Sequence, residues 1–406
     1  MKIAYLTAKF PFAPVEPFLE PEIRGLARIA EVVVIAARPE RKGSCYPDFG
    51  ATPVHLAFLD ARVVRLAWRE LFRDPRAVGR AFARVAFGPS SPRSRLVNLL
   101  LFPKALAIAQ TIRELGIEHV HASWLTTPAT LGYVASLLTG IPFSMSAHSH
   151  DIRAQNLLEP KAAHAAFVRV ISERNRRYVA ERLSPASARR CKVVHLGVDV
   201  PAAIVHPPAR VARILCSARL AEVKGHRYLV DALEMLQQHK VAFECDFAGD
   251  GELRSRIAAQ VARAGLEHRV HLVGAIDHER LTAALAAGAY DIVVLASTER
   301  PEEHEGIPVA LMEAMAAGVP AVATQTGSID ELVGPSAGIL VPQRNPASLA
   351  GALERLISDP LERRRLGEGA RAAVLAGFDG ARTIRQLAGL MGADASGRAA
   401  VPTQVA

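Results

Sequence analysis

Short apolar runs alternate with helix-like stretches along almost the whole of this 406-residue chain. The stretches between the runs are amphipathic: over residues 226–238, for example, Leu229, Leu233 and Leu236 fall on one face of a helix. Strands that alternate with helices form parallel sheets with right-handed crossovers, so an α/β fold with parallel sheets is predicted. The predicted strands are 2–7, 31–36, 53–57, 118–122, 142–147, 168–172 and 192–196 in the first half, and 212–217, 241–248, 269–273, 290–296, 319–324 and 338–341 in the second.

The strand–helix pattern pauses at residues 199–211, which contain three prolines and no periodicity, and this segment is interpreted as a linker. We therefore expect one α/β domain at 1–198 and a second at 212–377. A helix at 378–392 is expected to return to the first domain, and a flexible tail to follow at 393–406. Ligands bind beyond the carboxyl ends of the strands in such sheets, and two facing domains would enclose a cleft. Functional residues should therefore follow strands.

Several motifs that define other functions are absent from the sequence. The first strand–helix turn, residues 7–12, lacks G-x-G-x-x-G, which argues against a dinucleotide dehydrogenase, and the chain has no P-loop G-x-x-x-x-G-K-[ST]. No two aspartates stand one residue apart, so a magnesium-binding Asp-x-Asp is missing, and we expect neither a metal nor a cofactor. Phosphate chemistry would then depend on protein cations, helix N-termini and backbone amides.

Cysteine use and hydropathy favour a cytoplasmic protein. The four cysteines have no paired spacing, which fits reduced buried thiols better than a disulfide framework or a zinc site. The N-terminus runs from Met1 into the first predicted strand without the features of a signal peptide, and no window of 18 residues is uniformly apolar. The cysteines are Cys45, Cys191, Cys216 and Cys245.

The net charge of +9 is unevenly distributed. Residues 1–200 carry 28 Lys and Arg against 16 Asp and Glu, whereas the remainder carries 21 against 24. A basic half joined to a near-neutral half suggests that only the first domain meets a polyanion or an anionic membrane. The alternative is an arginine-rich coding bias without a binding function.

The basic character is concentrated in residues 62–87, which hold seven arginines and two acids. Pro75 divides this segment into two short predicted helices. A basic amphipathic helix can lie on an anionic bilayer, so peripheral docking on the inner face of the plasma membrane is expected here. The alternative is that the apolar face packs on the first sheet and leaves the arginines in water. The large apolar residues of the segment are Trp68, Leu71, Phe72 and Phe82.

The motif with the most chemical content lies at residues 290–334. Glu305 precedes a predicted helix and Glu313 lies within it, with Pro308 at the first helical position and Gly318 where the helix should stop. Eight residues are a little over two helical turns, so both carboxylates can border one ligand. The alternative is an N-capping glutamate and an exposed helical one.

The helix start after Glu305 should also bind an anion. Free amides at a helix N-terminus favour a group such as a diphosphate. Carboxylates beside a diphosphate are costly unless they bind hydroxyls, and ribose and hexose hydroxyls are suitable partners. The residues that would supply this turn are Gly306, Ile307, Pro308 and Val309.

Two further loops of the second domain follow strands. Arg219 and Lys224 stand five residues apart after strand 212–217, and two cations there suit a diphosphate leaving group in place of a metal. Loop cations are common, so this signal is weak by itself. Gly249 and Asp250 begin a glycine-rich turn after strand 241–248, which could approach a ligand or simply make a turn.

In the first domain, His148, His150 and Asp151 follow strand 142–147 and face the expected cleft. A lone histidine at a strand end is usually structural. The residues themselves do not distinguish His148 from His150.

Taken together, these motifs resemble those of the retaining glycosyltransferases of family 4, which share the two-domain GT-B fold. The resemblance rests on Glu305 and Glu313 with the Glu-Ala-Met-Ala-Ala-Gly-Val-Pro that follows, on Arg219 and Lys224, on the Gly-Asp-Gly turn and on residues 327–333. A narrower likeness is to the colanic-acid and exopolysaccharide enzymes of this family. The segments that carry it are 15–18, 147–151 and 171–175.

This resemblance implies two Rossmann-like domains, the first on the acceptor side and the second binding a nucleotide-diphosphate sugar. Arg219 and Lys224 would bind the donor diphosphate, and Glu313 the ribose hydroxyls. Glu305 and the amides after it would hold the transferred sugar, which His148 would contact from the first domain. Many family members have a Gly-Gly pair in the first loop, whereas this chain has Pro14-Val15-Glu16, so Glu16 would serve the acceptor instead, with Asp151.

The resemblance implies metal-independent transfer of a hexosyl group to a sugar hydroxyl with retention at the anomeric carbon. The acceptor would be a glycan or a lipid-linked precursor of an exopolysaccharide or surface glycan, and no nucleic acid is expected as a partner. Same-face attack with the leaving phosphate as base is favoured over a covalent intermediate on Glu305. Two alternatives stay open: a GT-B sugar-nucleotide epimerase, and an inactive nucleotide-sugar-binding subunit of a polysaccharide assembly.

Overall fold

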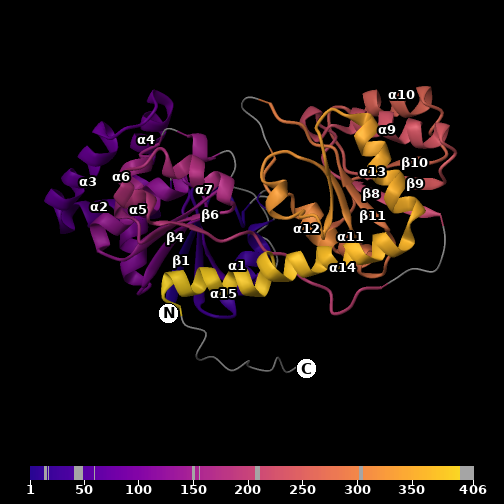
Figure 1. Ribbon diagram of the computed structural model, residues 1–406. Coiled ribbons are helices and arrows are strands. Elements are labelled where there is room, and N and C mark those ends of the chain that lie inside the picture. Colours follow the sequence, from indigo (N-terminus) through magenta and orange to yellow (C-terminus); the bar gives the residue numbers. More distant parts are fainter. Residues whose placement is uncertain are drawn as a thin grey trace. The chain divides into compact units, whose positions relative to one another are not determined.

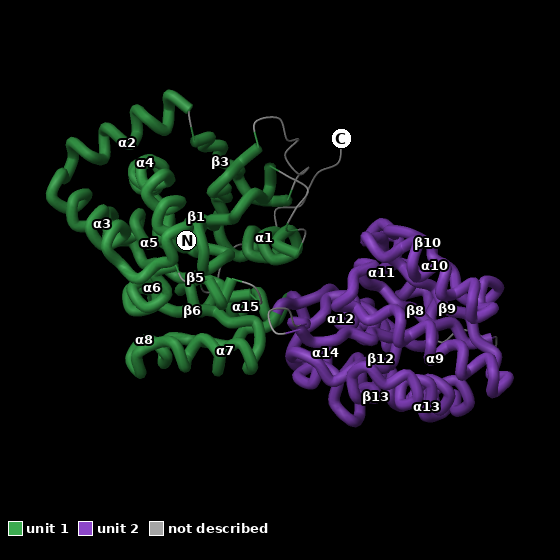
Figure 2. The backbone as a smooth tube through the Cα atoms, turned by 90° about the horizontal axis from the view of Figure 1, so that it is seen from above, with its two compact units in different colours: residues 1–195, 381–406 green, residues 196–380 purple. Residues whose placement is uncertain are grey.

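The computed structural model describes residues 1–12, 16, 18–40, 49–58, 60–148, 151–154, 156–205, 211–300 and 305–393. The chain divides into two compact units (Figure 2). Unit 1 comprises residues 1–195 together with 381–406, and unit 2 comprises residues 196–380. Most of the tail expected at 393–406 lies outside the described residues.

Unit 1 is built on a seven-stranded parallel sheet in the order β3-β2-β1-β4-β5-β6-β7. The inner strand β1 is almost entirely buried, as expected for a sheet covered on both faces. Its register pairs Ala4 with Val33 of β2 and with Val120 of β4. The strands are β1 (Lys2–Thr7), β2 (Glu31–Ala36), β3 (Thr52–Val54), β4 (His119–Ala122), β5 (Phe143–Ala147), β6 (Phe167–Val170) and β7 (Cys191–Val193).

Helices cover both faces of this sheet (Figure 1). On one face, α2 to α5 enclose the larger core; on the other, α1 and α15 pack together, and Leu26 and Leu387 share one cluster. The helices are α1 (Leu19–Ala27), α2 (Ala61–Arg73), α3 (Pro75–Phe87), α4 (Pro92–Glu114), α5 (Thr127–Thr139), α6 (Leu158–His164), α7 (Glu173–Ala180), α8 (Pro185–Ala188) and α15 (Gly380–Met391), with a 3-10 turn η1 (Asp151–Arg153).

Unit 2 repeats this architecture on a six-stranded parallel sheet in the order β10-β9-β8-β11-β12-β13. Its strands are β8 (Ala212–Ser217), β9 (Phe243–Ala248), β10 (Val270–Gly274), β11 (Ile292–Leu295), β12 (Ala321–Thr324) and β13 (Gly338–Val341). Its helices are η2 (Glu222–Lys224), α9 (His226–Gln238), α10 (Arg254–Arg263), α11 (His278–Ala286), α12 (Val309–Ala316), η3 (Ile329–Glu331), α13 (Pro346–Ser358) and α14 (Pro360–Gly377).

Each predicted strand is present, within a few residues at its ends, and the prediction of two parallel-sheet α/β domains is confirmed. In each sheet the first strand of the unit, β1 or β8, is an inner strand, third from the edge formed by β3 or β10, and the strand order reverses there. A ligand site is expected beyond the carboxyl ends of the strands at such a reversal.

No single helix in the described ranges is long and apolar enough to cross a membrane. The two halves of α4, Pro92–Leu100 and Phe102–Glu114, reach that length and composition only together, and they are bent by 50°. Pro103 lies at the bend, where it removes a helical hydrogen bond. The second half is a core helix, because residues 104–109 and Ile112 are buried.

Candidate functional site

The site of unit 2 is centred on an ion pair between Lys224 and Glu305. The Lys224 ammonium lies 2.8 Å from Oε1 and 2.7 Å from Oε2 of Glu305. The hydroxyl of Ser297, just beyond β11, donates to the same carboxylate at 2.9 Å. Both partners of the ion pair are mostly buried, with 21% and 11% of their side chains exposed. The carboxylate is therefore fixed by a cation and a hydroxyl at the carboxyl end of β11.

Two glycines permit this close approach of loops. Gly225 has φ +65°, and a Cβ there would lie 1.9 Å from the carbonyl oxygen of Ala296. Gly327 has φ +56°, and its Cβ would lie 1.7 Å from the carbonyl oxygen of Glu305. A larger residue at either position would force apart the backbones that bring Lys224 and Glu305 together.

Helix α12 begins at Val309, four residues after Glu305, and Pro308 is its N-cap rather than its first residue as the sequence predicts. In the described part of the chain, no group accepts a hydrogen bond from the amides of Gly306, Ile307 or Val309. These amides and the helix dipole form a small positive site beside Glu305. The helix stops before Gly318, which takes the left-handed conformation with φ +80°.

Glu313 lies on α12 and is held by a residue that the sequence analysis missed. Its Oε1 lies 2.7 Å from Nε2 of His278, the first residue of α11. The Glu313 side chain is 12% exposed, whereas that of His278 is 66% exposed. A sequence signal for His278 existed, because Asp277 before it is a helix N-cap shortly after β10.

Arg219, the second predicted cation, is exposed, and its guanidinium pairs with no acid of the described ranges. The Gly249–Asp250 turn packs behind it. Gly249 donates to the carbonyl of Gly274 at 2.7 Å, and a Cβ on Gly249 would lie 2.1 Å from the carbonyl oxygen of Ala218. The glycine is thus required by the backbone that leads to Arg219, while Asp250 is exposed.

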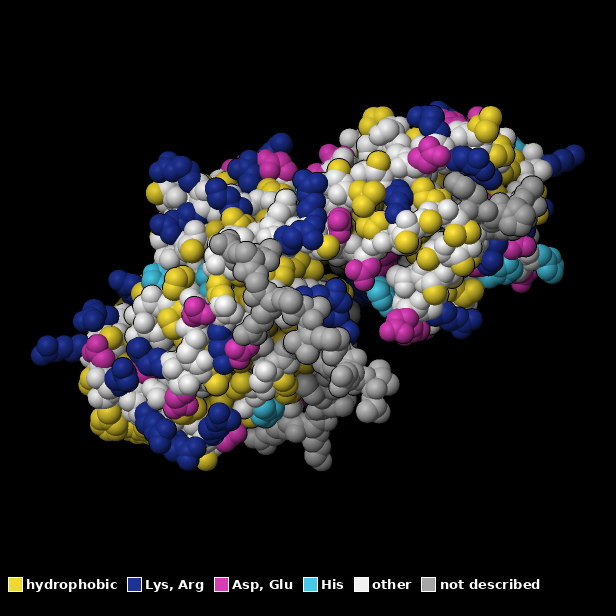
Figure 3. Space-filling view, turned by 90° about the horizontal axis from the view of Figure 1, so that it is seen from below, with side chains coloured by type: hydrophobic (Ala, Val, Ile, Leu, Met, Phe, Trp, Pro, Cys, Tyr) yellow, Lys and Arg dark blue, Asp and Glu magenta, His cyan; other side chains and the backbone are white. Residues whose placement is uncertain are grey.

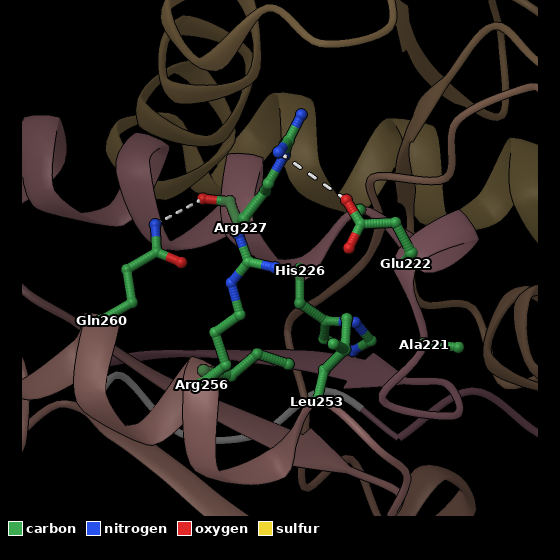
Figure 4. Close-up of a pocket in the computed structure, with 9 residues that line it drawn as sticks. Ala221, Glu222, His226, Arg227, Leu253, Arg256 and Gln260 are labelled. Atoms are coloured by element: carbon green, nitrogen blue, oxygen red, sulfur yellow. Dashed lines mark hydrogen bonds and ion pairs between the residues drawn. The ribbon is translucent and has the colours of Figure 1, made fainter.

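A pocket lies between the starts of α9 and α10, next to the turn that carries Lys224 (Figure 4). The Gln260 side-chain amide donates to the carbonyl of Arg227 at 3.0 Å, and the Arg227 guanidinium lies 3.7 Å from Oε1 of Glu222. His226 at its base is buried, which lowers the pKa of its imidazole to about 4 and keeps it neutral. Arg256 also lines this pocket.

In unit 1, His148 follows β5 and is buried beside two aromatic rings. The ring centroids of His148 and Trp124 are 4.6 Å apart, and those of His148 and Phe18 are 5.2 Å apart. Trp124, which the sequence analysis missed, follows β4. His150, the other histidine considered, lies outside the described residues.

Asp151 joins the ends of two neighbouring strands. Its Oδ1 accepts from the amide of His148 at 2.8 Å, and its Oδ2 accepts from the amide of Leu125 at 2.9 Å. Burial raises the pKa of this carboxyl to about 6, although these amides oppose the shift. The Lys161 ammonium donates to the carbonyl of Leu125 at 2.7 Å and completes the junction.

Glu16 has a backbone φ of +64°, and its carboxylate is engaged by the protein. It accepts from the amides of Lys9 at 2.8 Å and Phe10 at 2.9 Å, in the loop after β1, and from the indole N–H of Trp124. Successive amides that converge on one anion form a nest. In this structure the Glu16 carboxylate fills the nest and fixes Trp124.

No group of three or more His, Cys, Asp or Glu side chains in the described ranges could hold a metal ion. Cys191, Cys216 and Cys245 are buried free thiols, and burial raises the pKa of each. Cys45 lies outside the described residues.

Residues 205–373 match the glycosyl transferases group 1 family. The amylovoran biosynthesis glycosyltransferase AmsK of Erwinia amylovora is 36% identical over 189 residues, which are 46% of this chain and 45% of AmsK. WcaL of Escherichia coli K12, named for colanic acid biosynthesis, is 34% identical over 192 residues, 45% of this chain and 47% of WcaL. The chain thus spans about half the length of these curated relatives.

Solved structures show the same two-domain fold. Anabaena Alr3699/HepE, crystallised in complex with UDP, superposes with a TM-score of 0.70 at 20% identity, covering 97% of this chain and 100% of HepE. The likeness extends over both parallel-sheet domains, and the predicted GT-B fold is confirmed.

Proposed function

We propose that this chain, whose residues 205–373 match the glycosyl transferases group 1 family, transfers a hexosyl group from a nucleotide-diphosphate sugar to a sugar hydroxyl. The observation that carries the proposal is the Lys224–Glu305 ion pair at the start of α12, with Glu313 two turns further along. Carboxylates that can bind sugar hydroxyls then lie at one edge of the sheet, beside hydrogen-bond donors that can bind phosphate oxygens.

On this proposal, the donor diphosphate binds to Arg219, Lys224 and the amides of Gly306 and Ile307. An ammonium has three donors, and two are directed at Glu305, so one remains for a phosphate oxygen. Glu305 holds hydroxyls of the transferred sugar, and Glu313 holds the ribose.

The chemical step is proposed to pass through an oxocarbenium-like anomeric carbon as the diphosphate departs. Arg219, Lys224 and the α12 amides stabilise the negative charge that develops on the leaving group, without a metal. Attack of the acceptor from the same face, with the leaving phosphate as base, retains the anomeric configuration. Glu305 does not act as a nucleophile on this proposal, because the Lys224 ion pair and the Ser297 hydrogen bond already occupy its carboxylate oxygens.

In unit 1, we assign His148 to the transferred sugar and Glu16 and Asp151 to the acceptor side. The contacts of the two acids support an indirect role, because both carboxylates are occupied by backbone amides. Asp151 fixes the backbone of His148, and Glu16 fixes Trp124 and the loop after β1. They are positioning residues on this proposal.

The acceptor we propose is a lipid-linked precursor of an exopolysaccharide or surface glycan, used at the inner face of the plasma membrane. The names of AmsK and WcaL, which refer to amylovoran and colanic acid, support the polysaccharide class. The UDP bound by HepE supports a nucleoside diphosphate as the leaving group.

The test is a thermal-shift panel with UDP, GDP, ADP and their sugars, followed by turnover with a lipid-linked glycan acceptor. A ligand at a hundred times its Kd stabilises the native state by about 2.7 kcal/mol, which such a panel detects. Transfer with a retained anomeric configuration supports the proposal. Conversion of the donor without acceptor would instead identify an epimerase, and binding without any turnover would identify a silent subunit.

A further inference from the structure

Helix α2 has two apolar faces, and only one is covered. Val63, Leu66 and Ala67 are buried in the core that α2 shares with α4. Trp68 and Phe72 are 54% and 74% exposed, and Val64 continues their stripe at the same four-residue spacing. Packing on the sheet therefore accounts for one apolar face of α2 and leaves the second in solvent.

The exposed apolar side chains continue onto the next two helices. Phe87 at the end of α3 is 84% exposed, and Phe82 is also exposed. Leu96 and Leu100 are exposed one turn apart on α4. Both α2 and α3 pack against α4, and Figures 1 and 2 show the three helices along one outer side of unit 1. We call these seven residues and the arginines among them the α2–α4 surface.

The charge of the α2–α4 surface is mainly positive. Asp60 and Asp74 cap α2 and α3, and the buried carboxylate of Glu70 is paired with Arg113. Glu114, at the end of α4, is exposed and lies 3.7 Å from Arg69. Figure 3 shows Lys and Arg side chains among hydrophobic ones on one face of the molecule. The exposed arginines are Arg62, Arg65, Arg69, Arg73, Arg76, Arg80, Arg84, Arg93 and Arg95.

We propose that the α2–α4 surface docks on a bilayer that contains anionic lipids. Trp68 and Phe72, whose rings stack with centroids 5.5 Å apart, would enter the boundary between headgroups and acyl chains. The surrounding guanidinium groups would bind lipid phosphates, which they match in geometry. Each cation near an anionic membrane strengthens binding by about fivefold.

A bilayer fits this surface better than a second copy of the chain. An isologous dimer would bring nine arginines of one copy against the same nine of the other, with only Asp60, Asp74 and Glu114 of each copy as nearby acids in the described part of this surface. A bilayer supplies both anionic headgroups and an apolar layer. The inference is independent of the proposed reaction, although docking would bring a lipid-linked acceptor to unit 1.

Co-sedimentation with vesicles tests the proposal, using phosphatidylcholine alone and phosphatidylcholine mixed with phosphatidylglycerol, at low and high salt. Phe72→Ser with Arg73→Gln removes one apolar group and one cation from the α2–α4 surface. Leu361→Ser with Arg364→Gln is the matched control in unit 2, because Leu361 is 79% exposed and Arg364 is exposed. Thermal unfolding and the UDP shift of each variant show that it is folded and that donor binding is intact.

We expect the full-length protein to sediment with the anionic vesicles at low salt and not with the neutral ones. The Phe72/Arg73 variant should bind at least about tenfold more weakly, and the control should bind normally. The proposal is wrong if the folded protein does not sediment with anionic vesicles at low salt. It is also wrong if both variants lose the same affinity for these vesicles. It is equally wrong if the Phe72/Arg73 variant turns a dimer into a monomer or abolishes binding to nucleic acid while vesicle binding stays unchanged.

Discussion

The ammonium of Lys224 lies 2.8 and 2.7 Å from the two carboxylate oxygens of Glu305, a residue 81 positions further along the chain. The proposed phosphate ligand and the proposed sugar ligand are thus joined before any substrate arrives. The pair holds each side chain in one orientation, and it offsets the cost of burying either charge alone. A site arranged in this way needs little reorganisation when a donor binds.

Loss of either donor cation should reduce turnover. Arg219→Ala or Lys224→Ala should lower kcat by roughly a hundredfold to a thousandfold, because each removes a preorganised cation from the leaving diphosphate. Both variants should also bind UDP more weakly by calorimetry. Full activity should persist in EDTA. A requirement for added magnesium, with Arg219→Ala as active as the unaltered protein, would contradict this assignment.

The two glutamates should have separable roles. Glu313→Ala should weaken binding of the nucleoside diphosphate itself, since Glu313 is assigned to the ribose. Glu305→Gln should leave that binding nearly unchanged and remove the additional affinity for the nucleotide sugar. Calorimetry with both ligands distinguishes these outcomes. An equal loss of affinity for the nucleoside diphosphate and the nucleotide sugar in both variants would show that the roles are misassigned.

Gly327 should be required for the position of Glu305. Alanine there would place a Cβ 1.7 Å from the Glu305 carbonyl oxygen, at a φ of +56° that costs an alanine about 1–2 kcal/mol. We expect Gly327→Ala to lower kcat at least as strongly as Glu305→Gln. Gly334→Ala is the matched control, because a Cβ at Gly334 has nothing within 4 Å. Turnover and thermal unfolding of both variants check this, and similar activity in the two would exclude the steric argument.

The sequence predicted the fold more fully than the site. Strand positions depend on local apolar runs, and Glu305 and Glu313 are related by helical spacing within one segment. The contact between Lys224 and Glu305 depends instead on two loops that meet only in the folded sheet, through glycines whose conformation the pattern does not reveal. The same holds for His278 beside Glu313 and for Trp124 beside Glu16, since both pairs join residues that are distant in the chain.

The contacts of Glu16 differ most from those that the sequence predicted. The resemblance implied that Glu16, which stands where many family members have a Gly-Gly pair, serves the acceptor. In the structure the amides of Lys9 and Phe10 donate hydrogen bonds to its carboxylate. Any residue other than proline can donate a backbone hydrogen bond, so the identities of residues 9 and 10 do not indicate that their amides bind Glu16. Sequence alone therefore could not predict that Glu16 orders the loop after β1. Glu16→Gln is therefore expected to disturb the Trp124 position before it affects any substrate contact.

Asp151 should make stability and activity depend on pH. Burial raises the pKa of its carboxyl from 3.8 to about 6 in the folded protein. Between these values the native state binds more protons than the unfolded state, so the free energy of unfolding falls as pH rises from about 4 to about 6. A shift of this size corresponds to roughly 3 kcal/mol. The stabilisation is fully present below the unfolded pKa and is lost as pH rises through the folded one.

Asp151→Asn should abolish the fall in the free energy of unfolding between about pH 4 and pH 6, because an amide does not titrate. It should also loosen His148 or Leu125, since an amide can accept from only one of the two backbone donors that the carboxylate now binds. Urea unfolding across this pH range measures how the free energy of unfolding changes with pH, with Asp60→Asn, at the N-cap of α2, as the control. If Asp151 positions His148, kcat should fall even at a pH where the variant is fully folded. An unchanged pH slope together with unchanged kcat would exclude both roles.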